Sequence, residues 1–223
     1  MHIPDGFIDL QTSALFAALA AAGVGGALKG ARGQLSEKTA PLAGLTAVFI
    51  FAVQMLNFPV AAGTSGHLLG GALAAVLVGP WAATLALTVV LLMQGFLFAD
   101  GGLSALGLNV FNMGVIGVWF GYGVFLLIRK LLPKTKGSIP IAAAVGGFFS
   151  VPMAAAGFVF QYSIGGTATF STSTVLGAMV GTHILIGIGE ALITGLTVAA
   201  VLASRSDLVF GWNQKSSPLE IKG

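Results

Sequence analysis

Cysteine is absent from the 223-residue sequence, which excludes disulfide bonds, thiolate metal sites and cysteine nucleophiles. The G-x-x-x-x-G-K-S/T phosphate loop is also missing, so the chain does not bind ATP through that motif. An H-E-x-x-H pattern, which a zinc-dependent intramembrane protease needs, does not occur either. The three histidines, His2, His67 and His183, each stand alone in the sequence.

Charge is scarce as well. Charged residues make up 8% of the chain, hydrophobic residues make up 56%, and the mean hydropathy is +0.97. No charged residue occurs from Thr39 to Ala99 or from Gly137 to Gly189. A soluble core does not stay uncharged over such lengths, whereas membrane spans do. The net charge of +3 is too small to indicate a nucleic-acid partner. We therefore expect an all-α polytopic membrane protein.

Apolar stretches of helical length predict about seven transmembrane helices. Pro152 lies inside the sixth stretch, where a proline typically kinks a helix. The predicted helices cover residues 12–28, 41–58, 65–79, 82–98, 105–128, 139–160 and 175–203.

The basic residues indicate how these helices are oriented. They gather in three groups, and placing all three groups in the cytoplasm follows the positive-inside rule. This arrangement requires an odd number of spans, with the N-terminus outside and the C-terminus cytoplasmic. The three groups are Lys29, Arg32 and Lys38; Arg129, Lys130, Lys134 and Lys136; and Arg205, Lys215 and Lys222.

The first two residues have the composition of a metal chelate. The α-amino nitrogen of Met1, the backbone nitrogen of His2 and an imidazole nitrogen of His2 close one five-membered and one six-membered ring around an ion. Because His2 is large and no basic residue precedes Lys29, we expect neither removal of the initiator methionine nor a signal peptide. Three coplanar nitrogens suit Ni(II) or Cu(II). The alternative is a frayed, solvated chain end.

His67 is the candidate for a fourth nitrogen ligand. The predicted topology places both His67 and the N-terminus near the outer side of the membrane. The side chains of the preceding stretch 62–66 are too small and polar for a lipid-facing helix, so we expect irregular backbone there. Irregular backbone at membrane depth is tolerated only where protein buries it or where it lines a cavity. Ionisable residues within membranes are functional by default. The sequence therefore predicts a four-nitrogen site made by Met1, His2 and His67.

Four polar residues are candidates to support the ring of His67. A metal-bound imidazole usually donates its second N–H to a nearby polar group. The two asparagines of this set are equally suited to hydrogen bonding between helices. The four candidates are Thr64, Ser65, Asn109 and Asn112.

The last predicted helix carries two further candidates. His183 and Glu190 are seven residues apart and so share one helix face. Glu190 is a carboxylate inside a span, so we expect it to face the bundle interior and to pair with His183 or another polar group. For His183, a metal-ligating role and a structural hydrogen bond both remain open.

Four segments resemble the CbiM/NikM family. They are the start MHIPDGF and the stretches Gln54–Trp81, Asp100–Gly114 and Gly181–Gly195, and the similarity runs from Met1 to about Ser204. Members of this family are the cobalt- and nickel-capturing substrate components of energy-coupling factor (ECF) transporters. The resemblance implies capture of the ion from outside through Met1, His2 and His67.

The resemblance also implies partners on separate chains. These are a transmembrane coupling protein (CbiQ/NikQ-like) and a pair of ABC ATPases (CbiO/NikO-like). A small accessory membrane subunit is an optional further partner. The chain itself is then not an enzyme and holds no permanent cofactor, since Ni²⁺ or Co²⁺ is the transported ion. A stand-alone secondary Ni/Co permease is the alternative. Such permeases tend to carry an H-x-x-x-x-D-H pattern within a span, which is missing here.

These predictions combine into one layout for the chain. Residues 1–204 form a single transmembrane metal-capture domain, into which the N-terminal segment 1–10 is inserted, and residues 205–223 form a short solvated cytoplasmic tail. The expected location is the cytoplasmic (inner) membrane of a prokaryote, which the chain crosses several times.

Overall fold

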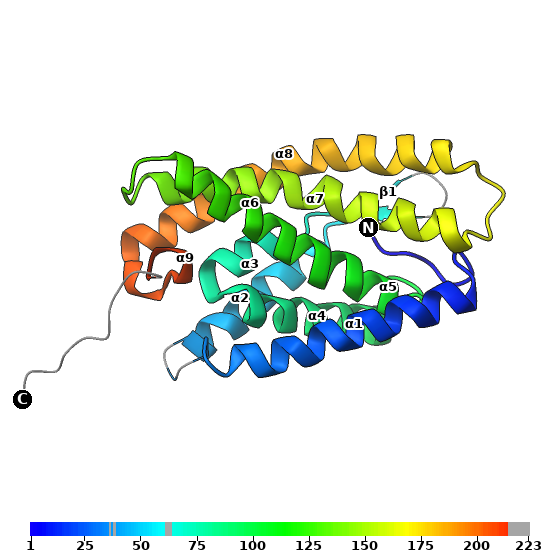
Figure 1. The fold of residues 1–223 in the computed structure, drawn as a ribbon, viewed down its shortest axis with the longest axis horizontal. Coiled ribbons are helices and arrows are strands. Elements are labelled where there is room, and N and C mark those ends of the chain that lie inside the picture. The colour runs from blue at the N-terminus through cyan, green and yellow to red at the C-terminus, as the bar shows by residue number, and fades with distance from the viewer. Residues whose placement is uncertain (36, 38, 61–63, 214–223) are drawn as a thin grey trace, which may run out of the picture.

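The computed structural model describes residues 1–35, 37, 39–60 and 64–213, and it is a bundle of helices (Figure 1). Among the described residues, five helical segments are long and apolar enough to cross a membrane. The expectation of an all-α polytopic membrane protein is confirmed, while the orientation of its ends remains a prediction. The five segments are α1 (Leu10–Ala31), α4 (Pro80–Phe98), Leu106–Leu131, α7 (Ser138–Gly165) and α8 (Thr172–Ser204).

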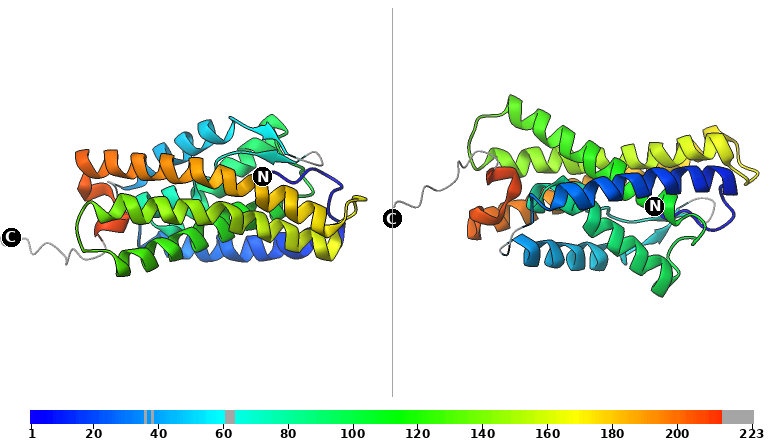
Figure 2. Two further views of the ribbon diagram at one scale, coloured as in Figure 1. Left: turned by 90° about the horizontal axis from the view of Figure 1, so that it is seen from above. Right: turned by 60° about the horizontal axis from the view of Figure 1, so that its bottom comes forward.

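The segment Leu106–Leu131 is one span made of three parts. It begins as α5 (Leu106–Asn109), continues as a π-helix over Val110–Gly117 and ends as α6 (Val118–Leu131). A π-helical stretch widens the helix and often marks a functional site. α7 continues through Pro152, and Figure 2 shows α7 lying beside α8 along much of its length.

Two shorter helices complete the apolar set. α2 (Thr39–Gln54) is apolar but shorter than the five spanning segments. α3 (Gly71–Val78) has only eight residues, and all of them are buried inside the bundle.

The third predicted helix, 65–79, was too long at its N-terminal end. Ser65–Gly66 form strand β2, which pairs antiparallel with β1 (Phe58–Pro59), and α3 begins only at Gly71. Gly70 explains the delay because it has a φ of 76°, a left-handed conformation that stops a helix from extending backwards. The residues between β2 and α3, including His67, therefore form an irregular connection inside the protein.

The chain end differs from the expected solvated tail. After a 3₁₀ turn at Ser206–Leu208, the short helix α9 (Phe210–Asn213) folds back onto the bundle. Val209 is fully buried, and Arg129 donates a hydrogen bond to the carbonyl of Gly211. Val209 and Gly211 are therefore buried rather than solvated, whereas Arg205 and Asp207 are exposed, and residues 214–223 lie outside the described part. Residues 62 and 63 of the small polar stretch 62–66 also lie outside the described part.

The N-terminal segment runs back into the bundle from the start of α1 (Figure 1). Met1 and Ile3 are each 1% exposed. Phe7 packs on Phe158 and Tyr162, with ring centroids 5.7 and 5.3 Å apart. The first two residues are therefore held within the protein.

Candidate metal centre

Polar contacts hold the N-terminal segment against the turn between α4 and α5. The N–H of Ile3 donates to Asn109 Oδ1 at 2.9 Å, and the Ile3 carbonyl accepts from the N–H of Gly102 at 2.8 Å. Asp5 Oδ1 accepts from the N–H and the hydroxyl of Ser104 at 2.8 and 2.6 Å. These bonds from Ser104 hold the pKa of the Asp5 carboxyl below its ordinary value. The position of residues 1–3 is thus set by several directed bonds.

The fold brings two of the three histidines into contact. The imidazole rings of His2 and His67 stack with their centroids 4.6 Å apart, and both side chains are buried. His2 Nδ1 lies 3.0 Å from Asp100 Oδ1, and His2 Nε2 lies 3.2 Å from Gln94 Oε1. His2 therefore has oxygen acceptors on both ring nitrogens, while His67 approaches its face.

His67 presents one ring nitrogen without a partner. Its Nδ1 lies 2.8 Å from the carbonyl oxygen of Leu68, and a carbonyl can only accept, so Nδ1 carries the proton. Nε2 keeps its lone pair, is buried and has no hydrogen-bond partner within the described residues. A buried acceptor without a partner is costly and calls for an explanation. A neutral imidazole nitrogen of this kind is a common metal ligand.

The α-amino group of Met1 is buried beside these rings. Burial lowers the pKa of this amine well below its ordinary value, although the negative charge of Asp100 acts in the opposite direction. Burial likewise lowers the pKa of His2, against the opposing effect of the hydrogen bond that its ring donates to Asp100. The backbone N–H of His2 points to Ser65 Oγ at 3.4 Å. Burial thus disfavours the protonated forms of the amine and the imidazole, in which a proton would occupy the lone pair that a cation needs.

Asp100 is the functional candidate that the sequence analysis missed. It follows α4 in a turn where Ala99 and Gly101 have positive φ values of 51° and 93°. Its carboxylate contacts His2 and accepts from Asn57 Nδ2 at 3.0 Å. Burial opposes ionisation, but the hydrogen bond and charge of His2 together hold the pKa of Asp100 below its ordinary value. An acidic residue in a predicted outer loop was the available signal.

An open cavity of about 320 Å³ lies over His2 and Asp100. It exposes the His2 side of the candidate centre. His67 and His183 are absent from its lining, which consists of His2, Pro4, Asp5, Ser65, Ala99, Asp100, Gly101 and Gly102.

Side chains alone do not complete a metal site. Among the described residues, no group of three or more His, Asp or Glu side chains could hold an ion. A metal site at His2 and His67 would thus need further ligands from other atoms than these side chains.

The predicted supporting residues take different places. Ser65 contacts His2, with its hydroxyl 3.5 Å from Nδ1, and Asn109 holds Ile3. Thr64 precedes Ser65 in the chain and donates to Met179 Sδ on α8 at 3.4 Å. Asn112 is not at the rings, because its amide forms a reciprocal pair with Gln161 at 2.7 and 2.9 Å. Asn112 therefore joins two helices.

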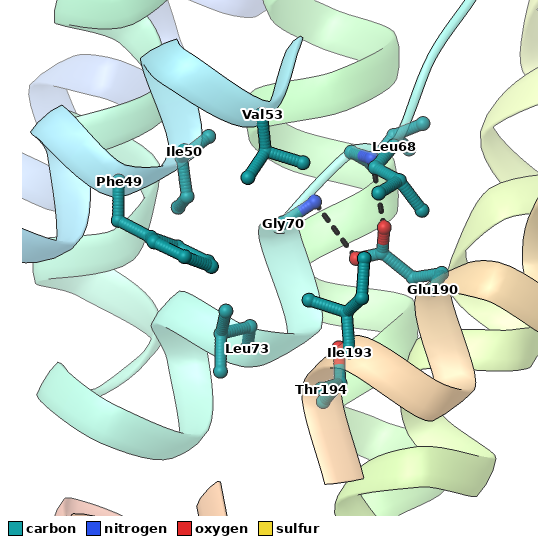
Figure 3. A pocket seen from close by; sticks show the side chains of 10 residues that line it. Phe49, Ile50, Val53, Leu68, Gly70, Leu73, Glu190, Ile193 and Thr194 are labelled. Atoms are coloured by element: carbon teal, nitrogen blue, oxygen red, sulfur yellow. Dashed lines mark hydrogen bonds between the residues drawn. The ribbon is translucent and has the colours of Figure 1, made fainter. Parts of the chain in front are cut away.

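Glu190 supports the backbone that carries His67. Its carboxylate accepts from the N–H of Leu69 at 2.9 Å and from the N–H of Gly70 at 2.7 Å (Figure 3). This places the carboxylate at the start of α3, where unsatisfied N–H groups favour a negative charge. Of the two expected kinds of partner, His183 or another polar group, the structure shows the second, in the form of backbone N–H groups.

His183 is fully buried on α8. Its Nδ1 lies 2.7 Å from the carbonyl of Met179, so Nδ1 donates and Nε2 keeps its lone pair. Within the described residues this Nε2 also has no hydrogen-bond partner. His67 and His183 thus share the same unusual state.

Proteins of similar sequence are named as metal transport proteins. A family model described as the cobalt uptake substrate-specific transmembrane region, CbiM, matches residues 2–208. A putative metal transport protein of Haloquadratum walsbyi is 41% identical over 212 residues, which cover 94% of each chain. A putative fused nickel transport protein, NikMN, of Archaeoglobus fulgidus is 39% identical over 98% of this chain and 70% of its own length. A cobalt transport protein, CbiM, of Sorangium cellulosum is 32% identical over 94% of each chain.

Solved structures have the same fold. The crystal structure of a truncated transition metal transporter matches with a TM-score of 0.84 and 33% identity, covering 92% of this chain and 99% of that chain. A second crystal structure, of a transition metal transporter, matches with a TM-score of 0.85 and 32% identity over 92% of this chain. The helical bundle described above is thus a fold found in transition metal transporters.

Proposed function

The chain belongs to the CbiM family of cobalt and nickel transport components, and from this premise we propose that it captures Ni²⁺ or Co²⁺ in a four-nitrogen site. The ligands are the Met1 amine, the backbone nitrogen and Nδ1 of His2, and Nε2 of His67. The observation that carries this proposal is the buried Nε2 of His67, which has no hydrogen-bond partner among the described residues and lies beside the stacked ring of His2. The site requires Met1 to be the first residue of the mature chain.

The surroundings of His2 suit the change that metal binding requires. Nδ1 must release Asp100 and direct its lone pair to the ion, so the ring proton moves to Nε2. Nε2–H then donates to Gln94 Oε1, which already lies 3.2 Å away. The backbone N–H of His2 gives up its proton to water, and burial favours the uncharged form of the Met1 amine that can bind the ion.

Asp100 serves the entry of the ion in this scheme. Its carboxylate lines the open cavity and reaches the rings, so it carries a negative charge at the mouth of the site. Such a charge raises the local concentration of cations and their association rate.

We assign to the chain the role of substrate-binding component in an ECF-type importer of the prokaryotic cytoplasmic membrane. A membrane coupling protein of the CbiQ/NikQ kind and a pair of CbiO/NikO-like ATPases on separate chains would supply the energy. The family placement supports this role, and the missing phosphate loop requires the energy to come from partners or an ion gradient.

An uptake assay tests the role and the site together. Cells that express the native chain with the coupling protein and ATPases should accumulate Ni²⁺ or Co²⁺, and His67→Ala should abolish the accumulation. Ser171→Ala, an exposed helix cap on α8 away from the rings, is the control and should leave uptake unchanged. Full uptake without the ATPases would contradict the ECF role and favour a secondary permease. Full uptake by His67→Ala would contradict the site.

A further inference from the structure

His183 is a second buried imidazole with a free lone pair, although the four-nitrogen site does not use it. Its side chain is fully buried, and its Nδ1–H bonds to the carbonyl of Met179 one turn earlier on α8. That bond fixes the tautomer and leaves the lone pair on Nε2, as the bond to Leu68 does for His67. Leaving a buried acceptor unpaired costs free energy, so a role for this nitrogen needs to be found.

The contacts on either side of His183 place it opposite His67. Thr64 bonds to Met179, and at the other end Leu69 and Gly70 bond to Glu190. The segment 64–70 therefore runs beside α8 in the same direction. His183 lies about 6 Å beyond Met179 along the helix axis, on the same face, and so faces the middle of that segment.

His183 is absent from the lining of the open cavity. His2, by contrast, faces Asp100 and Gln94 on the side of the open cavity.

We propose that His183 Nε2 is a further ligand for the transported ion, which it shares with His67 once the Met1–His2 chelate opens. This proposal rests on the proposed function. The cavity that lies over His2 and Asp100 does not reach His183, so the ion meets the chelate first and His183 afterwards. As a bond from the chelate to the ion breaks, a bond from His183 Nε2 forms. The His2 amide nitrogen regains a proton from water.

Acetylating Met1 prevents the Met1–His2 chelate from forming, so that metal binding at His67 and His183 can be measured alone. In the full chain with an acetylated Met1, residual Co²⁺ binding should depend on both His67 and His183. His183→Gln in the acetylated chain should weaken that residual binding at least about tenfold. The same substitution in the chain with a free amine should leave equilibrium Ni²⁺ affinity within about twofold but lower uptake by the complete transporter at least about tenfold.

The outcomes separate the two proposals. If the native chain with a free amine does not bind Ni²⁺ or Co²⁺, the four-nitrogen site itself fails. If it binds, but His183→Gln changes neither residual Co²⁺ binding nor uptake, the role of His183 is overturned. Should the variant fail to fold, X-ray absorption of Co²⁺ on the acetylated chain still decides. The measurement is made with His2→Ala also in place, which leaves His67 and His183 as the two imidazoles of the chain. Scattering from two imidazoles supports the proposal, and scattering from one or none overturns it.

Discussion

Asn109→Ala tests whether the metal centre depends on the seating of the N-terminal segment. Asn109 is 2% exposed, and its Oδ1 is the acceptor for the buried N–H of Ile3 at 2.9 Å. The Ile3 carbonyl keeps its bond from Gly102, so the substitution leaves one buried donor unsatisfied. That costs about 1–3 kcal/mol. If the segment detaches in the metal-free protein, metal binding must seat it again, and Ni²⁺ affinity falls about 5- to 150-fold.

The matched control for this experiment is Asn112→Ala. Asn112 is also a buried asparagine, lies three residues further along the same span and pairs with Gln161 rather than with the N-terminal segment. It should lower thermal stability but leave Ni²⁺ affinity within about twofold, once calorimetric titrations are normalised to the folded fraction. Unchanged affinity in Asn109→Ala, or an equal loss in both variants, would refute the reasoning.

Three further predictions follow from the same contacts. Affinity for Ni²⁺ should rise with pH in a pH-dependent titration, because the His2 amide must release a proton and protons compete for the Met1 amine and the imidazoles; an affinity independent of pH would contradict the chelate. Asp100→Asn should slow Ni²⁺ association and reduce its salt dependence in stopped-flow measurements, and an unchanged rate contradicts its role at the cavity mouth. Gly70→Ala should lower the free energy of unfolding by about 1–3 kcal/mol, because a Cβ there would lie 2.6 Å from Ile50 and the backbone has a left-handed φ of 76°. The control Gly44→Ala, which has open space around the new Cβ, should leave the free energy of unfolding unchanged.

The sequence was sufficient to predict the helical architecture, but not the backbone structure within the third predicted helix, 65–79. Long apolar stretches without charge identify spans, because any other backbone would leave polar groups unsatisfied in lipid. The start of α3 depends instead on the left-handed φ of Gly70 and on the bonds from its N-terminal backbone to Glu190. A pattern of residue types does not show which backbone groups a distant carboxylate will reach.

The candidate site divides in the same way. Met1 and His2 stand out because their chelating atoms are adjacent in the sequence, and the charge topology placed His67 near them. Asp100 and Gln94 escaped notice because their importance comes from contacts with His2 across about 100 positions of chain. Such partners become visible only once the fold brings α4 and the N-terminal segment together.

The most direct test of the four-nitrogen site compares Ni²⁺ binding by the purified chain with a free and with an acetylated Met1. Acetylation removes the basicity of the α-amine and leaves every side chain in place. We predict that affinity falls at least about tenfold and that the absorption spectrum of square-planar, nitrogen-bound Ni²⁺ is lost. Equal affinity and an unchanged spectrum would show that the ion is bound elsewhere.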